Sequence, residues 1–241
     1  MELHDFDLNY IEKWLPEASV KYKDGSPAVN PGLIITVFFK DGHTPEVRRR
    51  MVECVDRFYG EFKPWLKKTI TKNWVGITDN NYAKKRQEIL DSTPEEIFSW
   101  YLSSAEKDFL APDYDILIMG KRVFHNDNDR SVIKLTFPLS LLKEADGKKR
   151  YESWLMWLCD NFTVESGYAG LSFALPYAFE RMFPYEFALA QRFSGVMVDS
   201  LGTLEGGGAV IGLKGACWYT ILGTPWLEKL GGGRESKTSF S

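Results

Sequence analysis

The sequence predicts an α+β fold, with one compact domain built from a mixed or antiparallel sheet and flanking helices. Three observations support this prediction. Short apolar and β-branched runs recur along the chain, amphipathic segments lie between them, and no low-complexity linker divides the 241 residues. A chain of this length forms one large domain or two small ones, and the continuous pattern favours one, residues 1–241.

The first expected elements are a strand and a helix. Residues 33–39 (LIITVFF) are β-branched and aromatic, and turn signals lie on both sides of them. Thr44 then suits a helix N-cap, and Pro45 suits the first helical position. These signals predict a helix that runs to about Glu61.

The remaining elements follow from similar patterns. The expected strands are residues 70–77, 114–119, 131–138, 171–175 and 215–223, and the expected helices are residues 80–90, 92–103, 151–162, 177–191 and 225–230. The helix over residues 92–103 is predicted because Thr93 and Glu96 have the spacing of a capping box.

The two parts of the chain share a pattern. Each has a strand, a loop, a basic triplet and an amphipathic helix that contains a cysteine with an aspartate beyond it. A duplication would give two similar halves, residues 1–125 and 126–232, whereas ordinary α+β organisation would give the same pattern without one. Residues 233–241 are polar, and we expect a flexible tail there.

Charge and composition exclude several classes of protein. Lys and Arg total 30 and Asp and Glu total 33, so the formal net charge is -3 and a strongly basic nucleic-acid-binding protein is disfavoured. The sequence has no signal-peptide pattern and no apolar run near the roughly 20 residues that cross a bilayer. The three cysteines form no CxxC motif. We therefore expect a cytoplasmic protein with reduced thiols.

The sequence brings no catalytic or metal-binding residues together. The three histidines, His4, His43 and His125, lie far apart, and no HExxH motif occurs. The glycines at 206–208 are not followed by the Lys and Ser or Thr of a phosphate-binding loop. We predict no catalytic residue, no metal and no cofactor. A small enzyme that uses Cys159 or His125 with neighbouring aspartates is the alternative hypothesis.

The C-terminal third of the chain carries an ordered set of motifs. They are SGYAGLSF at residues 166–173, RFSGVMV at 192–198, GLKGACWYTILG at 212–223 and WLEKLGG at 226–232. In this order they resemble the type VI secretion immunity protein family (TsiV-like), and the resemblance extends from about Leu33 to Gly232. Ser194 and Met197 stand where the family has Pro and Asp, and these departures bear on individual contacts.

The resemblance implies a non-enzymatic immunity protein. Such proteins bind a cognate toxin that a contact-dependent secretion apparatus delivers, and family members are similar to partners of nuclease toxins of the VRR-Nuc type. The acidic composition agrees, because a domain that cuts DNA needs a basic surface for which an acidic protein can compete. No nucleic acid or membrane partner is implied. The alternative is an adaptor that loads a secreted effector without inhibiting it.

We expect acidic and aromatic side chains to contact the toxin. Aromatic residues make up 15% of the chain, and residues 79–129 hold eleven Asp or Glu against six Lys or Arg. The candidate partner-binding residues are Glu95, Glu96, Asp113, Asp115, Asp127, Asp129, Tyr177 and Tyr185. Buried aromatic anchors dominate the energy of many interfaces. The prediction is therefore an aromatic centre that is ringed by acidic residues.

Overall fold

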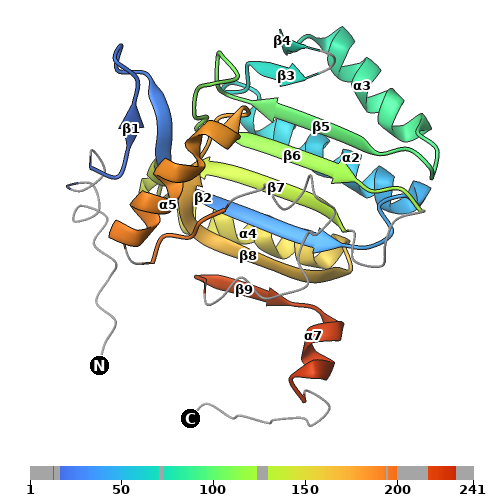
Figure 1. Cartoon of the computed structure of the whole chain (residues 1–241). Coiled ribbons are helices and arrows are strands. Elements are labelled where there is room, and N and C mark those ends of the chain that lie inside the picture. The colour runs from blue at the N-terminus through green and yellow to red at the C-terminus, as the bar shows by residue number, and fades with distance from the viewer. Residues whose placement is uncertain are drawn as a thin grey trace.

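One antiparallel sheet organises the chain (Figure 1). The computed structural model describes residue 13 and residues 17–70, 73–123, 130–193, 195–199 and 217–231. Its sheet has nine strands in the order β4-β3-β5-β6-β7-β2-β8-β9, with β1 paired to β2. Every pairing between these strands is antiparallel. The predicted α+β class is confirmed.

The elements have the following bounds. The strands are β1 (Val20–Lys21), β2 (Pro27–Phe39), β3 (Lys68–Ile70), β4 (Trp74–Gly76), β5 (Phe98–Ser103), β6 (Asp115–Gly120), β7 (Ser131–Pro138), β8 (Val164–Ala174) and β9 (Tyr219–Leu222). The helices are α2 (Pro45–Phe62), α3 (Asp79–Asp91), η1 (Leu139–Lys143), α4 (Gly147–Asn161), η2 (Phe179–Met182), α5 (Phe183–Arg192) and α7 (Thr224–Lys229).

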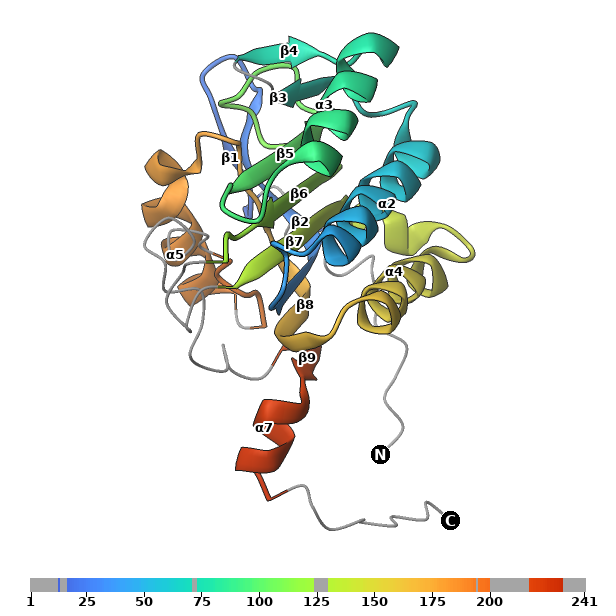
Figure 2. The ribbon, with the colours of Figure 1, turned by 90° about the vertical axis from the view of Figure 1, so that its right-hand side faces the viewer.

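Helices α2, α3 and α4 cover one face of the sheet, and α5 lies on the other (Figure 2). The main core forms under α2 and α4, where alternate residues of the strands meet the apolar faces of the helices. Phe62 of α2 and Trp154 of α4 are both buried there, with ring centroids 6.2 Å apart. The helices are also joined by an ion pair between Arg150 Nε and Glu61 Oε1 at 2.5 Å.

Several predictions from local pattern are confirmed. The Thr44 hydroxyl caps α2 by accepting a hydrogen bond from the Val47 amide at 3.4 Å. The expected strand over residues 131–138 is β7, and the expected helices over residues 80–90 and 151–162 correspond to α3 and α4. The segments at 131–138 and 151–162 were predicted from their apolar pattern, whereas residues 80–90 were predicted from a polar, helix-like composition.

The prediction of a helix over residues 92–103 is wrong. The Thr93 amide does donate to the Glu96 carboxylate at 2.7 Å, but the Glu96 amide returns to the Thr93 carbonyl at 3.1 Å, which closes a turn. The chain then enters β5, in which Phe98 and Trp100 alternate with Ser99 and face the core. The period of two in this aromatic segment outweighed the capping signal.

Three other elements differ from their predicted form. Residues 70–77 do not form one strand, because they are divided between β3 and β4, which pair with each other. The expected helix over residues 177–191 is split into η2 and α5, with Pro184 in the first turn of α5. The glycine-rich start of the 166–173 motif is part of β8, where Gly167 lies so close to β2 that an added Cβ would meet the Thr36 carbonyl at 2.7 Å.

The proposed division into halves remains a prediction. Strand β2 leads into α2 and strand β7 leads through η1 into α4, so each unit is a strand followed by a helix. The two strands pair in the middle of the sheet, and the two helices lie on the same face (Figure 1). The arrangement is the one that either a duplication or ordinary α+β organisation would produce.

Candidate functional site

The face of the sheet opposite α2 and α4 carries buried polar side chains. Because successive residues of a strand point to opposite faces, the neighbours of the core residues in β2, β5, β6 and β7 project there together. They include Thr36, Tyr101, Asp115, Lys134 and Thr136, all of them buried. This face is therefore unlike the apolar one in chemistry, although both are largely shielded from solvent.

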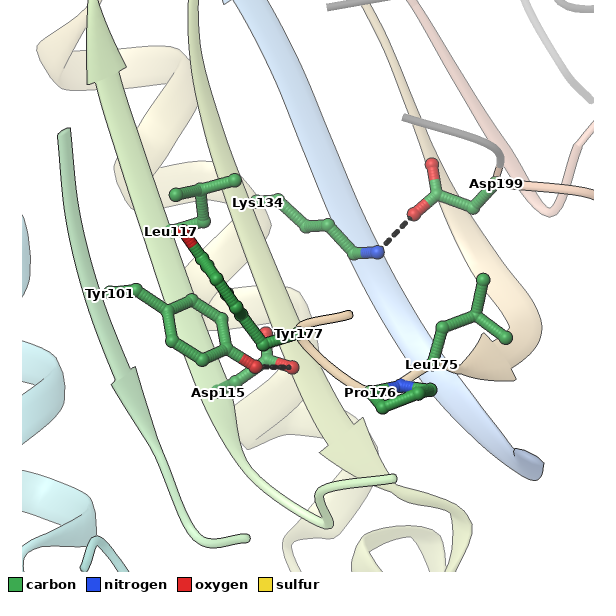
Figure 3. Close-up of a pocket in the computed structure, with 8 residues that line it drawn as sticks. All are labelled: Tyr101, Asp115, Leu117, Lys134, Leu175, Pro176, Tyr177 and Asp199. Carbon is green, nitrogen blue, oxygen red and sulfur yellow. Dashed lines mark hydrogen bonds and ion pairs between the residues drawn. The ribbon is translucent and has the colours of Figure 1, made fainter. Parts of the chain in front are cut away.

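A pocket opens on this polar face (Figure 3). It has a volume of about 50 Å³, and its lining residues are Tyr101, Asp115, Leu117, Lys134, Leu175, Pro176, Tyr177 and Asp199. Strands β5, β6 and β7 supply its floor. The other side is supplied by four residues that follow β8 in the chain, namely Leu175, Pro176, Tyr177 and Asp199.

One wall of the pocket is an ionic network centred on Asp199. The Lys134 ammonium lies 2.5 Å from Asp199 Oδ2, and the Tyr168 hydroxyl donates to Asp199 Oδ1 at 2.5 Å. The Asp199 amide donates to Glu186 Oε1 of α5, also at 2.5 Å. Burial works to lower the pKa of Lys134, but the charges of Asp199 and Asp115 outweigh burial and raise it. The network holds the segment after α5 against the sheet.

The opposite wall holds Asp115, which is only 4% exposed. The Tyr101 hydroxyl donates to its Oδ2 at 3.2 Å. Burial raises the pKa of Asp115 from 3.8 to about 6, although the positive charge of Lys134 acts in the opposite direction. Within the part of the chain that the structure describes, Asp115 has no ion-pair partner, whereas Lys134 pairs with Asp199.

A cluster of three aromatic rings marks the mouth of the pocket. The Tyr177 ring lies 5.1 Å from Tyr101 and 5.9 Å from Trp74, measured between centroids, and Tyr177 is 43% exposed. The Trp74 indole donates to the Glu106 carbonyl at 3.1 Å. The Ala178 amide donates to the Asp108 carbonyl at 3.0 Å, which anchors the chain beside Tyr177. The rim is thus built from residues held by backbone contacts.

The structure brings two of the eight candidate partner-binding residues together, since Asp115 and Tyr177 line the same pocket. Asp113 is exposed just before β6, and Tyr185 is exposed on α5. Glu95 and Glu96 are exposed in the turn before β5, at the opposite end of that strand from the pocket. Asp127 and Asp129 lie outside the described residues. The exposed acidic candidates therefore do not gather around one centre.

Sequence reasoning missed most of the pocket. A lysine inside the apolar run SVIKLTFP is a usable signal, because Lys134 occupies the strand position that points away from the core. Asp199 carried no comparable signal, since it acts on Lys134 from a distant part of the chain. Tyr168 was hidden within a glycine-rich segment that resembled a loop.

The cysteine chemistry of the enzyme hypothesis gains no support from the structure. Burial, and secondarily the charge of Asp160, raise the pKa of the half-buried Cys159 thiol. Burial also raises the pKa of Cys54. A thiol that keeps its proton is a poor nucleophile. His125 lies outside the described residues. Within the ranges described above, no group of His, Cys, Asp and Glu side chains is arranged to hold a metal ion.

Comparison with known proteins finds a matching family and a similar solved structure. The family model TsiV, described as Type VI immunity for VRR-NUC, matches residues 50–237. Among solved structures, Pseudomonas aeruginosa T6SS protein PA0821 is similar to this chain, with a TM-score of 0.68 and 21% sequence identity. The alignment covers 86% of this chain and 60% of that protein, so this chain spans about three fifths of its length. At this identity the similarity shows the fold alone. No curated protein matches the sequence.

None of the helices in the described part of the chain combines the length and the apolar character that a membrane crossing requires.

Proposed function

The chain belongs to the TsiV family, Type VI immunity for VRR-NUC, and on that premise we propose that it binds and inhibits a cognate type VI secretion toxin of the VRR-Nuc class. The observation that carries the proposal is the family match over residues 50–237, which extends from α2 to beyond α7. The protein would act in the cytoplasm, where the DNA substrate of such a nuclease lies, and would have no catalytic activity of its own.

The inhibition that we propose is steric and electrostatic. A nuclease domain presents cationic side chains to the phosphates of DNA. A protein that offers carboxylates and aromatic surface to the same side chains would exclude DNA from them, and charge complementarity would speed the association. The pocket on the polar face of the sheet joins these two features, because Asp115 and Tyr177 both line it.

Co-expression tests the proposal directly. The toxin encoded beside this chain should arrest growth when it is produced alone in the cytoplasm, and co-production of this chain should restore growth. The two proteins should also co-purify as a complex of defined stoichiometry. Continued growth arrest, together with the absence of a complex, would contradict the proposal.

The activity of the purified complex separates inhibition from the adaptor alternative. An immunity protein should abolish cleavage of a DNA substrate when it is mixed with the toxin in equimolar amount. An adaptor that only loads the effector would bind equally well but would leave the cleavage rate of the toxin unchanged.

A further inference from the structure

We propose that the pocket lined by Asp115, Tyr101 and Tyr177 is the receptor for one cationic side chain, an arginine or a lysine, on the surface of the cognate toxin. The inference rests on the proposed function, which it deepens by naming the chemistry of the contact. Its test below includes a probe that does not require the toxin.

The charges in the pocket favour a cation. Three charged side chains line it, namely Asp115, Asp199 and Lys134. Lys134 is 2.5 Å from Asp199, and Figure 3 shows its ammonium directed to that carboxylate. The carboxylate of Asp115 instead meets the neutral hydroxyl of Tyr101 at 3.2 Å, and the Lys134 charge acts on it without forming an ion pair with it in the described residues. Asp115 is therefore the lining group whose charge is least compensated, and a buried carboxylate of this kind is stabilised strongly by an incoming cation.

The aromatic walls favour the same occupant. Tyr101 and Tyr177 have ring centroids 5.1 Å apart, and the Trp74 ring packs against both, at 6.0 Å and 5.9 Å. Aromatic faces attract ammonium and guanidinium groups, most strongly where water is excluded. A pocket that joins aromatic faces to one buried carboxylate matches the two sides of a basic side chain, its apolar stem and its charged end.

The size of the pocket limits what can enter. Its volume of about 50 Å³ is enough for about three or four water molecules. That space suits the end of one side chain and is too small for a nucleotide or a drug-sized ligand. Tyr177 lines the pocket at the protein surface and is 43% exposed, whereas Asp115 is 4% exposed, so the carboxylate lies at the inner end of the pocket.

The pocket is built before any partner arrives. Asp199 fixes one wall through its contacts with Lys134, Tyr168 and Glu186. The other wall is fixed by the pairing of β5 with β6, in which Ser103 is the partner of Asp115. A site that is already ordered loses less conformational entropy when it is filled. The arrangement thus suits an anchor point for tight association.

Small probes test the pocket without the toxin. Methylguanidinium and methylammonium should bind the full chain, and the neutral N-methylurea should not, as followed by NMR shifts at Tyr101 and Tyr177. Asp115→Asn should weaken methylguanidinium binding about tenfold or more, because it removes a charge-assisted contact while keeping the side-chain volume. Asp160→Asn, on the exposed end of α4, is the matched control and should bind the probe as the natural chain does.

The pH dependence of probe binding adds a readout that a purely structural role would not give. A cation in the pocket favours ionised Asp115, so methylguanidinium affinity should rise as the pH increases from about 5 to 7.5. The charged and titratable groups around Asp115 are Tyr101, Tyr177, Lys134 and Asp199. Equal binding of cationic and neutral probes, or equal binding to Asp115→Asn, would overturn the inference.

The second test measures how tightly pocket variants bind the toxin. Asp115→Asn should lose about 30-fold or more in affinity for the toxin, and Asp160→Asn should lose none. Tyr177→Ala, a change at the exposed rim, gives a second variant that does not disturb buried charge. If the natural chain inhibits the toxin and both pocket variants inhibit it equally well, the inference fails while the proposed function stands. If the natural chain does not bind the toxin but the pocket binds methylguanidinium, the proposed function fails and the cation pocket stands.

Discussion

The two faces of the sheet bury different kinds of side chain, although the same strands form both faces. Under α2 and α4, residues such as Phe62 and Trp154 are apolar and fully buried. On the other face, Lys134, Asp115 and Asp199 are also buried, yet all three carry ionisable groups. Apolar burial stabilises a fold, whereas buried ion pairs are often no better than apolar replacements of similar volume. Buried ionisable groups that apolar residues could replace without loss of stability call for a functional explanation.

The largest effect should come from the apolar face. Phe62→Ala should lower the free energy of unfolding by about 3–5 kcal/mol, because the ring packs against Phe58, Tyr114 and Phe137 and its loss leaves a cavity. Denaturant unfolding would measure the change. The folded fraction should still bind the toxin with natural affinity. A loss below about 1 kcal/mol would mean that this face is not the stabilising one.

The next largest effect should come from the ionic network. Lys134→Met should destabilise the fold by about 3 kcal/mol, since it removes the cation that contacts the buried carboxylate of Asp199. The double variant Lys134→Met with Asp199→Asn should recover part of that loss, because the charge that Lys134 balanced is then also gone. Thermal and denaturant unfolding of the two single variants and the double variant form the cycle. Strict additivity would show that the two side chains are not coupled.

Unlike Lys134, Asp115 should lower the stability of the fold when its side chain is ionised. Its pKa is raised from 3.8 to about 6, so between these values the folded protein binds more protons than the unfolded chain does. This contribution to stability is present in full below about pH 4 and is lost as the pH rises through about 6. Relative to Asp115→Asn, the natural chain should therefore lose up to about 3 kcal/mol between pH 4 and pH 8.

The same pH series can contradict the predicted loss of stability. Unfolding curves of the natural chain and Asp115→Asn at several pH values from 4 to 8 give the difference in free energy at each pH. A difference that is constant with pH, or that grows in favour of the natural chain at high pH, would mean that the carboxylate is well compensated. Such a result would also weaken the contrast between the two faces, because Asp115 would then resemble an ordinary structural ion.

Local pattern accounts for the part of this molecule that the sequence predicted. Strand β7 and helix α2 each have a regular period and clear end signals, and both were predicted nearly to the residue. The helix expected from Thr93 and Glu96 failed because a capping signal describes only four residues, whereas the sheet imposes a period of two on all of β5. Elements with consistent signals along their length are therefore predictable from sequence.

The candidate site was less predictable, because it depends on contacts between distant segments. Asp115 and Tyr177 were chosen for their chemistry, but nothing local indicated that they line one pocket. Asp199 reaches Lys134 only because the segment after β8 returns across the sheet. The sequence contains every residue of the pocket, and the antiparallel strand order decides which of them meet.

The smallest effect on stability should come from the rim, and it completes the contrast between the faces. Tyr177 is 43% exposed, so Tyr177→Ala should change the free energy of unfolding by about 1 kcal/mol or less. Tyr177→Phe keeps the ring that packs against Tyr101 at a tilted angle and should be neutral. Denaturant unfolding of both variants beside Phe62→Ala compares three changes to aromatic residues under one condition. If Tyr177→Ala destabilised the fold as much as Phe62→Ala, the aromatic cluster at the pocket mouth would belong to the stabilising core. A small effect on folding with a large effect on toxin affinity would instead locate the binding energy on the polar face.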